Sequence, residues 1–158
     1  VEYSSYPESY QINSSRFMIE NGADIVIGGH PHVVQPSEEY TTESGHKGYI
    51  LYSMGNFLSN QRKETLNGDI RTEQGVAVEV NLMLDPNTGE KELVSTKEHP
   101  LWVRRTSVND DIRLHEVVLA EEYKPGGSKA SEISESQQKR AEQAYDMTRK
   151  TLEKEIQN

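Results

Sequence analysis

The first part of the chain alternates between one amphipathic stretch and two short apolar runs that stop at glycines. Residues 8–21 have the apolar spacing of a helix, and Asn21-Gly22 is a typical helix end. The runs at 23–28 and 48–54 each end in a glycine turn, which is typical of strands. The apolar positions expected to share one face of the helix are Tyr10, Phe17 and Met18.

The period of the pattern changes further along the chain. Apolar and polar residues alternate from 75 to 83, which indicates a half-buried strand. A turn at 85–89 and the run at 91–103 complete a predicted hairpin, and 115–119 is a further short strand. The polar stretch 60–74 is expected to form a long loop.

The C-terminal region is predicted to be a helix joined by a linker. Pro-Gly-Gly-Ser at 125–128 is typical of a linker. Ser134 and Gln137 fit a capping box at the start of a helix over 134–156. Its narrow apolar stripe, typical of docking on a sheet edge or a partner, consists of Ala141, Tyr145, Leu152 and Ile156. The predicted division is a main unit at 1–120, a linker at 121–133 and a C-terminal helix at 134–158.

Composition narrows the classes that fit this pattern. Apolar residues make up 33% of the 158 positions, so polar loops dilute the core of a single domain. The net charge of −9 argues against general binding of nucleic acid or anionic membranes. The absence of cysteine excludes disulfides and thiolate metal sites, and no apolar run reaches the length of a membrane span. Because the chain starts at Val1 rather than Met, an upstream anchor or signal is compatible with it.

The most informative residues for function are two histidines after the first predicted strand. His30 and His32 follow Gly28-Gly29, and Pro31 between them disfavours the helical region for His30. In an extended segment, residues two apart point to the same side, so both rings are expected to face one point. Imidazole pairs suit zinc, manganese or iron, whereas the plain alternative is two exposed or core-edge histidines. A catalytic metal needs at least three protein ligands, so the site is incomplete within this chain.

Other polar residues are weaker candidates. Asn56 follows the second strand and either points into the site or is a turn residue. Gln35 and Ser53 are candidate hydrogen-bond partners for the histidines. Arg104-Arg105 either binds an anion or guards a sheet edge. The remaining histidines lie in no recognisable motif: His46, His99 and His115.

Two segments carry a family resemblance. Residues 22–36, Gly-Ala-Asp-Ile-Val-Ile-Gly-Gly-His-Pro-His-Val-Val-Gln-Pro, and 49–58, Tyr-Ile-Leu-Tyr-Ser-Met-Gly-Asn-Phe-Leu, closely resemble the bacterial capsule synthesis protein CapA family. Members of that family include poly-γ-glutamate biosynthesis proteins. The resemblance covers roughly residues 1–105, and Val1-Glu2-Tyr3 resembles the segment that follows a His-Trp-Gly motif in the family.

The resemblance implies a fold and a site. The family is related to calcineurin-like metallophosphoesterases, so the expected fold class is α/β (α+β), the C-terminal part of a four-layer αββα sandwich with an added C-terminal helix. It implies that His30 and His32 are ligands in a centre of two divalent metals, manganese, zinc or iron. It places Asn56, a candidate catalytic residue, at the edge of that site.

The same comparison implies that part of the centre lies elsewhere. The related phosphoesterases carry an Asp-x-His motif, a bridging aspartate and a Gly-Asn-His motif in their N-terminal half, and none occurs here. The chain is therefore expected to be a C-terminal portion that pairs with a missing N-terminal half or with another copy of itself. Family resemblance also implies a membrane-anchored, extracytoplasmic protein.

Three functions remain open. The first is part of a metal-dependent hydrolase or ligase-like site for a phosphoester or a glutamyl amide, inactive without the rest of the protein. The second is a non-catalytic cell-surface scaffold that binds the polymer or the synthase complex. The third is an interaction domain whose terminal helix docks on a partner.

Overall fold

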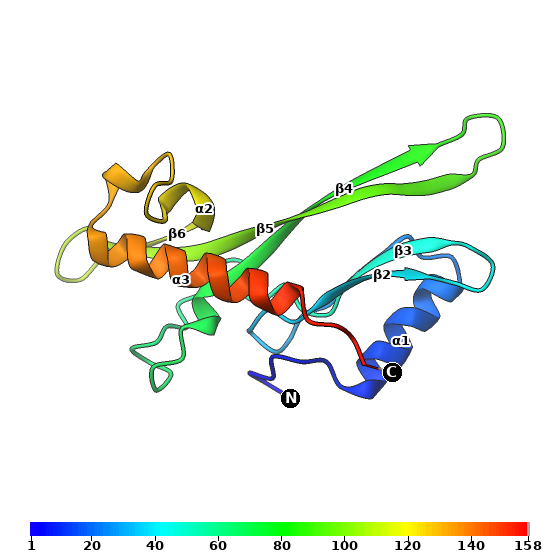
Figure 1. The fold of residues 1–158 in the computed structure, drawn as a ribbon. Coiled ribbons are helices and arrows are strands. Elements are labelled where there is room, and N and C mark those ends of the chain that lie inside the picture. The colour runs from blue at the N-terminus through cyan, green and yellow to red at the C-terminus, as the bar shows by residue number, and fades with distance from the viewer. Residues whose placement is uncertain (158) are drawn as a thin grey trace.

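The computed structural model describes residues 1–157 as a mixed α/β structure with two small sheets (Figure 1). The mixed α/β class is as predicted. Helices are α1 (Ser9–Glu20), α2 (Ala120–Tyr123) and α3 (Glu135–Leu152), with 3₁₀ turns η1 (Arg71–Glu73) and η2 (Ala130–Glu132). Strands are β1 (Ile25–Ile27), β2 (Ser37–Thr41), β3 (Lys47–Leu51), β4 (Gln74–Leu84), β5 (Lys91–Ser107) and β6 (Arg113–Leu119).

The first sheet has the order β1-β3-β2, with β1 parallel and β2 antiparallel to β3. Helix α1 covers it through Ile12 and Ile19, which pack with Ile50 and Tyr52. The face predicted from Tyr10, Phe17 and Met18 is not the buried one, because these side chains are 62%, 63% and 50% exposed. The helix has apolar residues on two sides, and the periodicity of the sequence does not say which side meets the sheet.

The second sheet is an antiparallel meander of order β4-β5-β6. Strands β4 and β5 form the predicted hairpin, which extends as a long arm past the first sheet (Figure 1). The pairing register shifts between Asn81 and Leu82, where β5 has one extra residue, Val94, in a bulge. Before this shift, Val76, Val78 and Val80 pack against residues of the first sheet, on one face of β4 as the alternation in the sequence indicates.

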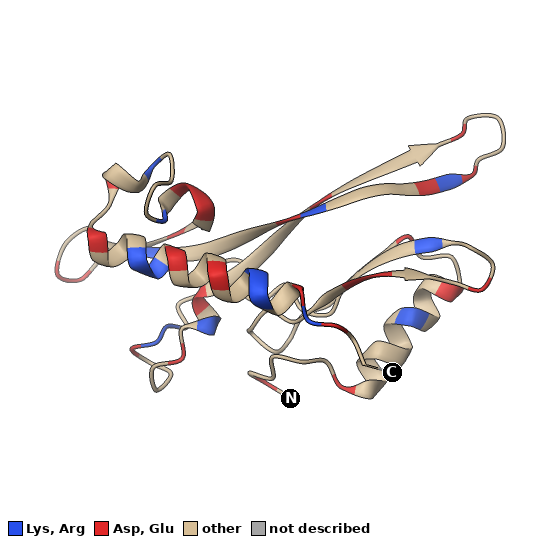
Figure 2. Ribbon diagram, viewed as in Figure 1, with Lys and Arg blue, Asp and Glu red and all other residues tan. Residues whose placement is uncertain are grey.

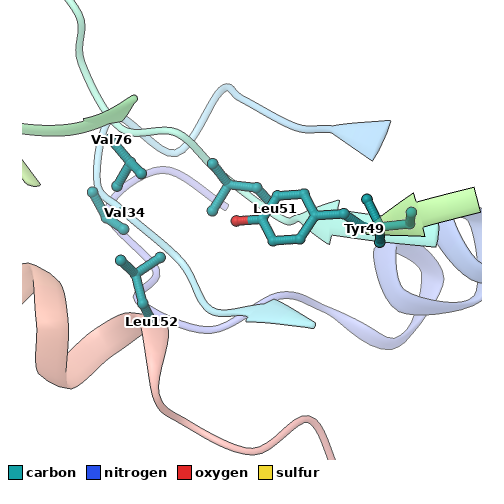
Figure 3. Close-up of a cluster of buried hydrophobic side chains, with 6 residues drawn as sticks. Val34, Tyr49, Leu51, Val76 and Leu152 are labelled. Atoms are coloured by element: carbon teal, nitrogen blue, oxygen red, sulfur yellow. The ribbon is translucent and has the colours of Figure 1, made fainter. Parts of the chain in front are cut away.

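One hydrophobic cluster joins both sheets to α3. Figure 3 shows Val34, Val76 and Leu152 gathered together, with Tyr49 and Leu51 along β3 beside them. A second cluster packs α2 and α3 on β5, and it consists of Trp102, Ala120, Tyr123, Ala141 and Ala144. Helix α3 therefore packs on the second sheet and reaches the cluster shared by both sheets through Leu152 at its end.

The segment 121–133, expected to be a linker, is folded. It contains the end of α2 and all of η2, and Lys129 donates to Glu122 through both its backbone and its side chain. The capping box of Ser134 and Gln137 is confirmed at the start of α3. The helix ends at Leu152, so Ile156 lies beyond it and packs in the cluster under α1 instead.

Charged residues of both signs alternate along α3 (Figure 2). Among the described residues, no helix has the length and apolar character that a membrane crossing requires.

Candidate functional site

The ends of β1 and β3 are held close together by glycine. Gly28 N–H donates to Leu51 O at 2.7 Å, and Met54 N–H donates to Gly28 O at 3.1 Å. A Cβ at Gly28 would lie 2.1 Å from Tyr52 O, so only glycine fits at this crossing. The segments that follow both strands, which carry the histidines and Asn56, therefore start side by side.

The backbone of the histidine turn differs from the prediction. His30 and His32 have φ of 94° and 62°, so the segment is not extended, and Tyr3 beside it has φ of 62°. Proline usually places the preceding residue in the β or polyproline region at negative φ, and His30 departs from that region as well as from the helical one. Pro31 itself is buried, and its carbonyl accepts a hydrogen bond from Tyr3 N–H at 2.8 Å. The burial of Pro31 therefore fixes the turn between the two histidines.

His32 and Asn56 are in direct contact. The distance from His32 Nδ1 to Asn56 Oδ1 is 3.0 Å, and the Tyr3 ring lies 6.1 Å from the His32 ring between centroids. Both His32 and Asn56 are half-buried, whereas His30 is exposed. When its ring is neutral, His32 donates from Nδ1 to the amide oxygen, which leaves the Nε2 lone pair free.

The Gly-Asn-Phe turn at residues 55–57 packs against the first residues of β4. Asn56 N–H donates to Gln74 O at 3.0 Å, and Gly55 forms an isolated bridge with Gly75. A Cβ on Gly55 would lie 2.5 Å from Gln74 O, and one on Gly75 would lie 2.4 Å from Asn56 O. Both glycines permit this approach, so the second sheet borders the histidine turn.

The Asn56 side chain has further partners that the sequence did not indicate. Its Nδ2 donates to Gln61 Oε1 at 3.1 Å and to Thr72 O at 2.9 Å. Gln61 Nε2 in turn donates to Tyr3 Oη at 3.4 Å. No local pattern connects these positions, because they lie in the polar stretch 60–74 and at the start of the chain.

Gln35 and Ser53 do not contact the histidines. Gln35 is 1% exposed, and its Nε2 donates to Ser4 O at 3.0 Å. Ser53 is fully buried, and its Oγ accepts from Gly55 N–H at 3.2 Å. Both residues support the loops around the site, so their predicted role as direct partners of imidazole is wrong.

The other candidates lie away from the histidine turn. His46 Nε2 is 3.0 Å from Ala23 O, and His99 Nε2 is 3.9 Å from Glu79 Oε2. Arg105 pairs in register with His115 across β5 and β6. Arg104 lies over the Tyr123 ring at 5.7 Å and is 3.8 Å from Glu116.

The side chains at the histidine turn supply some, but not all, of the ligands that a catalytic metal centre needs. Within residues 1–157, no group of three or more His, Cys, Asp or Glu side chains is placed to hold a metal ion. His32 offers its Nε2 lone pair and His30 is accessible, which makes two imidazole donors at most. A catalytic centre with three or more protein ligands requires donors from outside this set.

These observations define a mixed α/β protein with a strained histidine turn beside a Gly-Asn-Phe loop. Residues 1–61 match the family model described as bacterial capsule synthesis protein PGA_cap. The PGA biosynthesis protein CapA of Bacillus subtilis (strain 168) is 32% identical over 119 residues, which is 73% of this chain and 28% of that protein. The capsule biosynthesis protein CapA of Bacillus anthracis is 36% identical over 81 residues, 51% of this chain and 17% of that protein. No solved structure matches.

The chain belongs to the CapA family of bacterial capsule synthesis proteins, as its two motifs indicate. The matched region spans less than a third of either curated relative.

Proposed function

We propose that this chain is the C-terminal part of a metal-dependent phosphoesterase-like unit in a CapA-type capsule or poly-γ-glutamate synthesis protein. The observation that carries the proposal is the His32–Asn56 pair, whose geometry leaves the His32 Nε2 free beside the accessible His30. Metal-bound histidines commonly donate their other ring N–H to an oxygen acceptor, as His32 does here. Strained backbone is also concentrated at functional sites.

His30 and His32 are the proposed ligands for divalent manganese, zinc or iron, with two ions in the complete centre. When bound, such ions polarise a phosphoester or glutamyl amide and lower the pKa of bound water. Asn56 holds the His32 ring rather than the reacting group, because both ends of its amide are occupied within the chain. Its proposed role is therefore to position a ligand.

The proposed source of the remaining ligands is the rest of a longer polypeptide. An apolar groove of about 270 Å³ lies between β1 and β4, lined by Ile27, Leu51, Met54, Phe57, Val76, Ala77 and Val78. Within residues 1–157, β1 pairs with β3 alone, and Ile25 and Ile27 are 37% and 44% exposed. The curated relatives are much longer than the matched region, and we propose that part of their additional sequence adds strands beside β1. Such strands would complete the four-layer sandwich, in an assembly anchored outside the cytoplasm.

The decisive measurement is the metal content of the chain extended to the full length of its relatives. We expect stoichiometric manganese, zinc or iron in the long protein and its loss in the His30→Ala/His32→Ala double variant. His99→Ala is the matched control and is expected to keep the metal, because His99 lies on the second sheet away from the turn.

Three outcomes would contradict the proposal or a part of it. A long protein that takes up no metal under any loading condition would favour the non-catalytic scaffold that binds the polymer or the synthase complex. Metal-dependent turnover of a phosphoester or glutamyl substrate by residues 1–158 alone would show that this chain needs no further ligands. A long protein that forms dimers through β1, with metal shared between copies, would identify the second copy as the source of the ligands.

A further inference from the structure

A buried ion pair closes the loop that borders the histidine turn. Arg62 and Glu73 are both 2% exposed, and Arg62 Nη2 lies 3.0 Å from Glu73 Oε2. Arg62 Nη1 also donates to Val103 O at 2.9 Å, and Glu73 Oε1 accepts from Lys63 N–H at 3.0 Å. Arg140 of α3 donates to the same carboxylate. The two ends of the loop are thus fixed to each other and to the second sheet.

The neighbours of this pair in sequence are the two acceptors of the Asn56 amide. Gln61 precedes Arg62, and Thr72 precedes Glu73. Gln61 Oε1 and Thr72 O lie 3.1 Å and 2.9 Å from Asn56 Nδ2. Closing the ion pair therefore brings two oxygen acceptors around one NH₂ group.

These acceptors determine which way the amide faces. The carbonyl of Thr72 can only accept a hydrogen bond, so the amide group opposite it must be the NH₂ of Asn56. The amide oxygen is then left to face His32 Nδ1. A neutral His32 ring must carry its proton on Nδ1 to make that bond, and the lone pair stays on Nε2.

We propose that the Arg62–Glu73 pair is a clamp that positions the Asn56 amide and thereby fixes His32 in the tautomer with Nε2 free. Arg62 and Glu73 are positioning residues in this device, and Arg140 connects it to α3. The inference rests on the proposed function only for the use of Nε2 as a metal ligand. The tautomer itself follows from contacts within the chain.

A buried ion pair is weak evidence for stability, because well-packed apolar residues of similar volume often serve as well. Apolar residues, however, make no directional hydrogen bonds, so they would not hold the neighbouring Gln61 and Thr72 in one orientation. The clamp is therefore expected to control the orientation of the amide, and its removal is expected to change His32 while the fold is kept.

The test is ¹⁵N NMR of the histidine ring nitrogens in the 158-residue chain, at a pH where the rings are neutral. We expect the wild-type His32 to show a pyrrole-type Nδ1 and a pyridine-type Nε2. In the Arg62→Met/Glu73→Met double variant, which leaves no unpaired buried charge, we expect both nitrogens to move toward averaged shifts of two exchanging tautomers. Asn56→Leu supplies the reference spectrum of a ring without its acceptor.

Arg16→Met/Glu38→Met is the matched control. Arg16 lies 2.9 Å from Glu38, and neither residue adjoins Gln61 or Thr72 in sequence, so the His32 spectrum is expected to stay unchanged. Far-UV circular dichroism and Trp102 fluorescence report whether each variant is folded.

Two results would overturn the inference. One is a wild-type His32 in the Nε2–H form, which needs no variant to detect. The other is a folded double variant whose His32 keeps Nδ1–H entirely, which would mean that the Thr72 carbonyl holds the amide without the clamp. The two proposals can fail separately. If His32 is in the Nδ1–H form but the full-length protein takes up no metal, the clamp is supported and the proposed metal-dependent function is contradicted.

Discussion

At the scale of single residues, backbone strain is concentrated at the histidine turn. Of the four non-glycine residues with positive φ within 1–157, three lie together, namely Tyr3, His30 and His32. Each such conformation costs about 1–3 kcal/mol and persists only where the surroundings impose it. Here those surroundings are the buried Pro31, its hydrogen bond to Tyr3, and the crossing of Gly28 over the end of β3.

Gly28→Ala is expected to lower the free energy of unfolding by about 3 kcal/mol, as overpacking against an immobile backbone does. The added methyl would lie 2.1 Å from Tyr52 O, which belongs to the main chain and cannot rotate away. Gly29→Ala is the control, because nothing lies within 4 Å of a Cβ there. Urea unfolding of both variants measures the difference, and equal stabilities would contradict the account of the crossing.

At the scale of elements, the pairing of β5 with β6 places His115 beside Arg105. The pKa of His115 is held below its ordinary value, first because burial removes water from the ring and then because Arg62 and Arg105 repel the added proton. The unfolded chain therefore binds this proton at a higher pH than the native protein does. The contribution of His115 to stability is present above its ordinary pKa of about 6.5 and falls as the pH drops below it.

Arg105→Gln is expected to raise the pKa of His115 and to lessen the loss of stability between about pH 7.5 and pH 5.5, on either side of the ordinary histidine pKa. An NMR titration of the His115 ring gives the pKa directly, and urea unfolding at the two pH values gives the linked stability. Arg113→Gln, two residues from His115 on β6, is the control for a change of net charge. An unchanged His115 titration in Arg105→Gln would contradict the assigned cause.

The elements also show what the sequence can and cannot predict. Local patterns located α1, the β4–β5 hairpin and the capping box of α3, because each depends on neighbours within a few positions. They did not indicate which face of α1 meets the sheet, because that face is determined by tertiary contacts. Ile12 and Ile19 are buried because they pack against Ile50 of β3 and Tyr52 just after it.

The candidate site divides in the same way. The motif predicted the contact region of His32 and Asn56, because glycine turns after adjacent strands bring their flanking residues together. The positive φ values and the Arg62–Glu73 pair were not predictable, because both are imposed by tertiary burial.

At the scale of the whole molecule, α3 connects the two sheets. Leu152 packs in the cluster that both sheets share, and Arg149 lies 3.7 Å from Glu98 on β5. Glu98 also accepts from the hydroxyl of Tyr49 on β3 at 3.0 Å. These contacts make the helix a structural part of the main unit, whatever else its outer face binds.

Leu152→Ala is expected to lower the free energy of unfolding by about 2–4 kcal/mol, through lost burial and the cavity left behind. Leu152 is 4% exposed at the meeting point of the sheets, so both should lose stability in one transition. Leu84→Ala, at a position 61% exposed on the hairpin arm, is the control and should change stability little. Two separate unfolding transitions in Leu152→Ala, one for each sheet, would contradict a shared core.

The hydroxyl of Tyr6 donates to Glu155 O at 3.2 Å and accepts from Gln157 N–H at 2.7 Å, across 149 and 151 positions of sequence. The blue and red ends of the ribbon accordingly lie near each other in Figure 1. The two contacts of the Tyr6 hydroxyl therefore form only after residue 157 has been synthesised, so this part of the fold closes late in translation.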